Sequence, residues 1–92
     1  MDLEALRDQI NSIDDAIIQL IIQRMNVSAQ IAEYKHVHGL PIYVPQREAE
    51  ILADISRKCP EDVCEHLQKL FKTIFEISKA HQKAYLTDRK TQ

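Results

Sequence analysis

The chain has 92 residues, of which 45% are hydrophobic and 28% charged, with one glycine and three prolines. This composition predicts one small, strongly helical domain over residues 1–92, with room for a single hydrophobic core. The net charge of −2, without a basic run or basic residues interleaved with aromatic ones, argues against nucleic-acid binding, and no apolar stretch approaches the length of a membrane span.

The first predicted helix is unusually long for so short a chain. Asp2 is a suitable N-cap, and the helical period then continues unbroken until Gly39, which stands where a helix commonly ends. A helix of about 35 residues would be about 50 Å long at a rise of ~1.5 Å per residue. A globule of this size is much narrower, so we expect the apolar face of this helix to be covered partly by a second chain.

Two further helices are predicted after the loop that contains Pro41 and Pro45. Pro45 is well placed as the first residue of a short helix that runs to about Arg57, because this position needs no amide hydrogen. A third helix is expected from about Pro60 to Leu86, where apolar residues recur at intervals of three and four. The predicted fold class is therefore all-α, with a long, a short and a long helix in each chain.

Two cysteines, Cys59 and Cys64, lie between the second and third predicted helices. No matching cysteine or histidine pair stands at the spacing of a structural zinc site, so we expect no metal and interpret both cysteines as free thiols. With no secretory leader upstream, the sequence favours a cytoplasmic location, where thiols stay reduced. The four histidines are interpreted as solvated or packed side chains.

Charged residues interrupt the apolar stripe of the first helix. Arg7 and Arg24 fall in a seam of three- and four-residue spacings, and the same face continues through Ile31 to Lys35. Such long side chains can reach solvent past the apolar face, or nearby carboxylates can neutralise them. Burying several cations without an anion is costly, however, and this face offers few carboxylates. We therefore favour an anionic ligand.

The separation of the two arginines predicts how that ligand would be held. Arg7 and Arg24 are 17 residues apart in the sequence, which corresponds to about 25 Å along a straight helix. No small molecule spans this distance, so both arginines can contact one ligand only if they come from different chains. The sequence therefore predicts an intertwined two-fold homodimer with two equivalent sites.

Further candidate binding residues lie on the second and third predicted helices. Arg47 and Glu48 follow Pro45, where the loop could fold them over a site, although an exposed helix start is the simpler interpretation. Ser78 and Gln82 are one helical turn apart on a face of the third helix that is otherwise apolar. A hydrogen-bonded pair within the core is the alternative to a ligand-binding role for them.

In this order, the candidate residues resemble those of the all-helical chorismate mutases. The segments "LRDQINSIDDAIIQLIIQR", "AEYK", "RE" and "SKAHQ", with a proline in the intervening loop, carry the resemblance, which extends roughly from Leu3 to Tyr85. It implies an intertwined helical homodimer that rearranges the dianion chorismate to prephenate, without a metal or cofactor. It also implies that the product feeds the biosynthesis of phenylalanine and tyrosine.

The resemblance implies how the substrate would be bound. Arg24, together with Arg7 of the partner subunit, would bind the two carboxylates of chorismate. Arg47 would help to close the site, and Ser78 would add a hydrogen bond to a carboxylate. Glu48 would accept a hydrogen bond from the ring hydroxyl.

The resemblance also implies which residues act on the reacting atoms. Lys35 and Gln82 would bracket the ether oxygen, whose bond to the ring breaks, and would stabilise the negative charge that develops there. Ile31 and Ile74 are suited to form apolar walls. Val44 stands in the loop where some relatives carry an acidic residue, so loop closure is expected to differ from theirs.

Other functions remain open at this point. The same scaffold could cleave isochorismate to salicylate and pyruvate, or rearrange the 4-amino analogue of chorismate, although Glu48 favours a substrate with a 4-hydroxyl group. A non-catalytic helical dimerisation module is an alternative from a different class, because long amphipathic helices suffice for it. That alternative predicts that neutral residues can replace the four cations without functional loss: Arg7, Arg24, Lys35 and Arg47.

Overall fold

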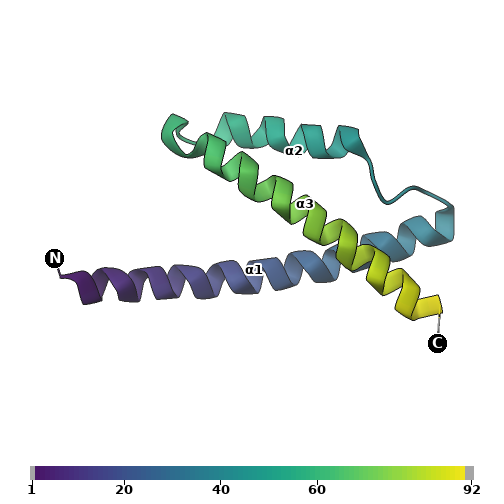
Figure 1. Cartoon of the computed structure of the whole chain (residues 1–92), viewed down its shortest axis with the longest axis horizontal. Coiled ribbons are helices and arrows are strands. Elements are labelled where there is room, and N and C mark those ends of the chain that lie inside the picture. Colours follow the sequence, from purple (N-terminus) through teal and green to yellow (C-terminus); the bar gives the residue numbers. More distant parts are fainter. Residues whose placement is uncertain (1, 91–92) are drawn as a thin grey trace.

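A computed structural model describes residues 2–90 of the chain. The described residues form three helices and no strand: α1 (Leu3–His38), α2 (Pro45–Lys58) and α3 (Glu61–Lys90). The predicted all-α class and the order of a long, a short and a long helix are confirmed (Figure 1).

The ends of α1 follow from the capping residues. The Asp2 carboxylate accepts a hydrogen bond of 2.7 Å from the Ala5 amide, which satisfies one of the unpaired N–H groups of the first turn. Gly39 ends the helix in the left-handed conformation, with φ of 66°, which glycine adopts without a steric penalty. The Leu40 amide then donates to the Lys35 carbonyl at 2.8 Å, so the last turn is closed.

The first half of α1 projects away from the rest of the chain (Figure 1). Residues 2–20 are all exposed, and they include Ile10, Ile13, Ile17 and Leu20. The radius of gyration is 16.7 Å, against about 12 Å for a compact chain of this length. The accessible surface is 7277 Å², against about 5,500 Å² for a monomer of this mass. The chain therefore leaves a long apolar helix face uncovered.

The remaining elements meet on α3. This helix crosses the second half of α1, and α2 packs on α3 rather than on α1 (Figure 1). Within the described part of the chain, the buried apolar side chains are Ala32 and Phe75, and the buried polar ones are Ser28, Ser78 and Gln82. The fully buried part of the α1–α3 crossing is thus small, and most of its side chains are polar and therefore need hydrogen-bond partners.

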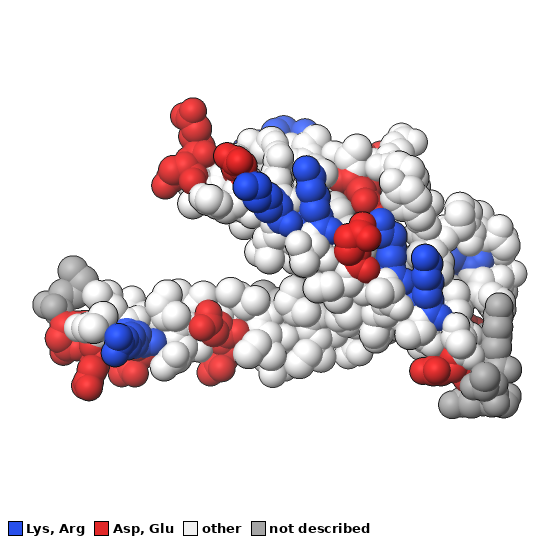
Figure 2. Space-filling model, viewed as in Figure 1, with Lys and Arg blue, Asp and Glu red and all other residues white. Residues whose placement is uncertain are grey.

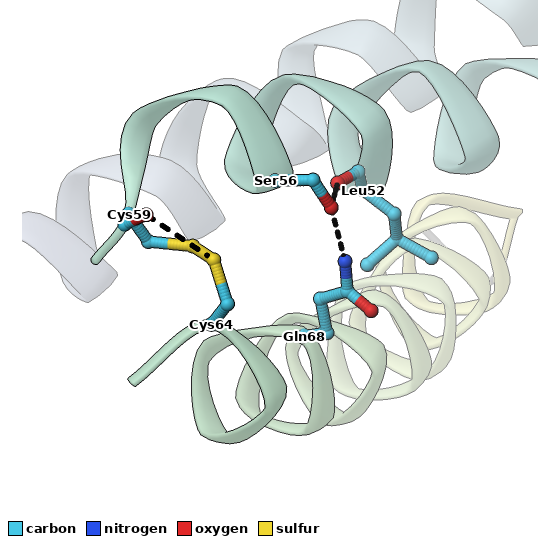
Figure 3. The surroundings of a disulfide bond; sticks show 5 residues. All are labelled: Leu52, Ser56, Cys59, Cys64 and Gln68. Carbon is cyan, nitrogen blue, oxygen red and sulfur yellow. Dashed lines mark hydrogen bonds between the residues drawn. A yellow bond between two sulfur atoms is a disulfide. The ribbon is translucent and has the colours of Figure 1, made fainter. Parts of the chain in front are cut away.

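The prediction of two free thiols is wrong for this structure, because Cys59 and Cys64 form a disulfide (Figure 3). Cys59 is the C-cap of α2 and Cys64 lies in the first turn of α3, so the short turn brings their Cα atoms to 5.3 Å, a usual separation for disulfides. The spacing of zinc ligands has no bearing on this pairing, because the turn between α2 and α3 alone brings the two cysteines together. Gln68 of α3 also donates to the hydroxyl of Ser56 on α2, which joins the same two helices (Figure 3).

Candidate active site

A pocket of about 270 Å³ lies between the second half of α1, the start of α2 and the second half of α3. Eight of the ten residues predicted for the site line it: Arg24, Ile31, Lys35, Val44, Arg47, Glu48, Ser78 and Gln82. The fold therefore brings together residues that are separated by up to 58 positions in the sequence.

Arg24 is held at the α1–α3 crossing by two contacts. Its Nη1 atom donates a hydrogen bond of 2.7 Å to the hydroxyl of the buried Ser78, and its guanidinium carbon lies 6.0 Å from the ring centroid of Phe75. A guanidinium has five N–H donors, so the bond to Ser78 occupies only one of them. The arrangement fixes the guanidinium while leaving it able to bind an anion in the pocket.

Lys35 and Gln82 are each bound to a main-chain carbonyl. The Lys35 ammonium donates to the carbonyl of Ile42 in the α1–α2 loop at 3.1 Å. The Gln82 amide donates to the carbonyl of Ser28 on α1 at 2.9 Å. An ammonium has three donors and an amide two, so each group keeps donors for a ligand while a carbonyl positions it.

The cations on α1 lack counter-ions within the part of the chain that the structure describes. None of the ion pairs there involves Arg24 or Lys35. Both side chains are half-buried and line the same pocket. A half-buried cation without a carboxylate partner is stabilised by a bound anion, so the pocket is suited to a negatively charged ligand.

The start of α2 brings a second pair of charges to the pocket. Pro45 is the first residue of the helix, and the amides of Arg47 and Glu48 donate to the Val44 carbonyl at 3.0 and 3.3 Å. Arg47 is exposed and pairs loosely with Glu50 at 3.6 Å. The Glu48 side chain is better covered, and its carboxylate pairs with a lysine of α3.

Two predicted residues lie outside this pocket. Arg7 is exposed on the projecting half of α1, far from Arg24 on the same helix. Ile74 is half-buried and does not line the pocket; the neighbouring Phe75 does, with its ring against Arg24.

Sequence reasoning missed two important lining residues, Phe75 and Lys79. A signal for both was present, because Phe75 stands three positions before Ser78, and Lys79 stands three positions before Gln82, on one helical face. The prediction instead took Ile74 as the apolar neighbour of Ser78 and Gln82 on this helix. The further apolar lining consists of Val27, Ile42 and Ile51.

The described residues offer neither a metal-binding cluster nor a membrane span. Among them, no group of three or more His, Cys, Asp or Glu side chains is placed to hold a metal ion. None of the described helices combines the length and the apolar character that crossing a membrane requires.

Comparison with known proteins gives consistent matches. The family model for chorismate mutase type II matches residues 6–83. The chorismate mutase of Methanocaldococcus jannaschii is 38% identical over 88 residues, which cover 94% of this chain and 89% of that protein. Among solved structures, the chorismate mutase (form II) from Thermus thermophilus matches with a TM-score of 0.84 and 32% identity, over 88% of this chain and 93% of that one.

A longer protein also matches part of the chain. The T-protein of Enterobacter agglomerans is 52% identical over 52 residues, which cover 56% of this chain. The matched segment is 14% of that protein, so the present chain corresponds to only a small part of the T-protein.

Proposed function

Because the chain belongs to the chorismate mutase type II family, we propose that it is an isomerase that rearranges chorismate to prephenate. The observation that supports this most directly is the pocket in which Arg24 and Lys35 have no carboxylate partner within the described chain. Chorismate carries two carboxylates and would supply the missing negative charge.

The reaction requires the protein to position the substrate rather than to supply a nucleophile or a base. A C–O bond to the ring breaks while a C–C bond forms within the same molecule, so no proton or leaving group passes to the enzyme. The flexible enolpyruvyl arm must be held over the ring. This conformation is rare in the free molecule, and the pocket would bind the substrate in it. Arg24 and Ser78, already joined at 2.7 Å, would hold one carboxylate, while Ile31 and Phe75 would limit the space around the ring.

Lys35 and Gln82 would act on the ether oxygen. Negative charge builds on this oxygen as its bond to the ring stretches, and donors aimed at it stabilise the transition state more than the substrate. Their hydrogen bonds to the Ile42 and Ser28 carbonyls hold both donors in place before the substrate arrives. This prior positioning lowers the reorganisation that the reaction demands.

The start of α2 would close the site. Glu48 would accept a hydrogen bond from the ring hydroxyl, and Arg47 would exchange its loose partner Glu50 for a substrate carboxylate. Val44, which also lines the pocket, has an apolar side chain that cannot form a hydrogen bond with the hydroxyl. Only the main chain of Val44 can supply a polar contact there.

We further propose that two chains form an intertwined homodimer. The exposed apolar residues on the first half of α1 and the roughly 1,800 Å² of surface above that expected for a monomer support this proposal. Figure 2 shows an uncharged stretch along the middle of α1, which suits burial against a second helix. With α1 antiparallel to its counterpart, Arg7 of the partner subunit would reach the pocket and bind the second carboxylate.

A cytoplasmic location and a role in phenylalanine and tyrosine biosynthesis belong to the same proposal. A cytoplasmic location predicts that Cys59 and Cys64, which are joined by a disulfide in this structure, are reduced thiols in the cell. Trapping the thiols with an alkylating agent in intact cells, before lysis, would decide between the two redox states.

The proposal is tested by following chorismate consumption by ultraviolet absorbance with the purified protein and identifying the product chromatographically. We expect prephenate at an enzyme-like rate. Salicylate from isochorismate, or faster rearrangement of the 4-amino analogue, would replace the assigned substrate. A folded dimer that consumes none of the three compounds would refute the enzymatic proposal and favour a dimerisation module.

A further inference from the structure

Lys79 lines the pocket but has no part in the reaction proposed above. Its ammonium lies 3.1 Å from Glu48 Oε2 on α2 and 3.0 Å from Glu76 Oε1 on its own helix. It also stands 4.3 Å from the ring centroid of Tyr43 in the α1–α2 loop. Lys79 therefore joins three segments of the chain at the end of the pocket where Glu48 lies.

The pair between Lys79 and Glu48 differs from the other ion pairs of the described chain. Their side chains are 20% and 25% exposed, and the two residues belong to different helices. The other pairs all join residues three or four positions apart on one helix and have at least one side chain more than half exposed. Hydrogen bonds from Lys79 to Glu76 and to Glu48 raise the pKa of Lys79, so the lysine stays positively charged at neutral pH.

The pairing sets the charge that a ligand meets at this end of the pocket. Glu48 Oε2 is engaged by Lys79, and the other carboxylate oxygen can still accept a hydrogen bond from a neutral hydroxyl. A positively charged substituent would be attracted by Glu48 and repelled by Lys79, so its net attraction is small. Glu76 adds little to this balance, because it does not line the pocket and its side chain is 74% exposed, so solvent screens its charge. Without Lys79, Glu48 would be a lone carboxylate that favours a cation.

We propose that Lys79 is a specificity-determining residue that makes the pocket select a ring with a hydroxyl group over a ring with a positively charged amino group at the position facing Glu48. This inference rests on the proposed function and deepens it, because it names the group that discriminates between chorismate and its 4-amino analogue. An amine of ordinary pKa is protonated at neutral pH, so the two compounds differ there by one charge.

The test compares kcat/KM for chorismate and for 4-amino-4-deoxychorismate in the wild-type protein, Lys79→Met, Lys79→Gln and Lys79→Arg. Lys83→Met is the matched control, since Lys83 lies one turn further along α3 and outside this pocket. Where the amino compound is bound but not turned over, its inhibition constant against chorismate replaces kcat/KM.

We expect the neutral variants to lower the preference for chorismate by about tenfold, mainly through tighter binding of the amino compound. Lys79→Arg and Lys83→Met should keep the wild-type preference. Because two neutral variants are measured, the failure of one to fold leaves the other to decide.

Turnover of chorismate with an unchanged preference in the neutral variants would overturn this inference alone, and so would an equal change in Lys83→Met. A wild-type protein that prefers the amino compound would overturn it as well. A wild-type protein that turns over neither compound would overturn the proposed function and this inference together.

Discussion

At the scale of single residues, the site depends on donors that the main chain holds in position. Lys35 and Gln82 reach the pocket from α1 and α3, and each donates to a carbonyl of another segment. Arg24 is fixed in the same way by the hydroxyl of Ser78. The three side chains are therefore oriented before any ligand binds, which is the condition for electrostatic stabilisation of a transition state.

Lys35→Ala is expected to lower kcat by about 10²–10³-fold. The donor that it removes acts on charge developing in the transition state, so kcat should fall much more than substrate affinity. Steady-state kinetics measure this. Lys69→Ala is the control, because Lys69 is an exposed residue of α3 that, among the described residues, forms an ion pair with Glu65 alone. Equal kinetics of Lys35→Ala and wild-type protein, with circular dichroism spectra also equal, would exclude the catalytic role.

Gln82→Glu is expected to make the activity depend on pH. The amide donates a hydrogen bond at every working pH, whereas a carboxyl group donates only when it is protonated. The activity of the variant should therefore be low at pH 7 and rise as the pH falls towards the carboxyl pKa of about 4–5. The wild-type protein should show no need for acid between pH 6 and 8. Parallel pH profiles of the two proteins would contradict the assignment of Gln82.

At the scale of helices, α2 is the element whose position depends most on links to another helix. It has 14 residues, packs on α3 alone, and begins without a side-chain cap at Val44. The disulfide between Cys59 and Cys64 and the hydrogen bond from Gln68 to Ser56 join it to α3 at the end away from the pocket (Figure 3). Isolated helices of this length are marginal in water, so these links keep Arg47 and Glu48 in reach of the site.

Reducing the disulfide is expected to lower the free energy of unfolding by about 2 kcal/mol, the loop-entropy value for a closed loop this short. Urea unfolding with and without a reductant measures the effect. A double variant, Cys59→Ser with Cys64→Ser, should resemble the reduced protein and should not respond to the reductant. The same unfolding midpoint for oxidised and reduced wild-type protein would show that the disulfide contributes no stability.

The helices and part of the site could be predicted from sequence, because their signals are local. Asp2 and Gly39 mark the ends of α1, and Arg24 and Lys35 are conspicuous because cations interrupt an apolar period. The disulfide could not be predicted in this way, since it depends on how the α2–α3 turn folds. The contact of Lys79 with Glu48 likewise depends on the packing of α2 on α3. The third helix extends to Lys90 rather than about Leu86, a shift of the size expected where helix ends fray.

At the scale of the whole molecule, the chain is elongated and flat, with principal extents of 54 × 30 × 14 Å. The longest extent equals the length of α1, at ~1.5 Å for each of its residues. Arg7 is exposed on the first half of α1, which projects away from the other described helices. The proposed exchange of Arg7 between subunits follows from this shape, and it can be tested without a structure of the dimer.

Mixing two inactive variants is expected to restore activity. Arg7→Ala and Lys35→Ala, unfolded together in equal amounts and refolded, should form hybrid dimers in which one of two sites keeps both residues. Random pairing predicts about a quarter of the wild-type activity. A mixture of Lys35→Ala with Gln82→Ala should stay inactive, because both residues line the pocket of one chain. No recovery in the first mixture would refute the shared site.

The exposed first half of α1 affects how the protein responds to dilution. If its apolar residues are covered only by a second copy, folding and association are one equilibrium, and stability depends on the amount of protein present. The midpoint of thermal unfolding should therefore rise as the protein concentration is raised from nanomolar to micromolar, and specific activity should fall on strong dilution. A midpoint that is independent of concentration would mean that the chain is stable alone. If the midpoint does depend on concentration, the amount of this protein that a cell makes determines how much of it is folded.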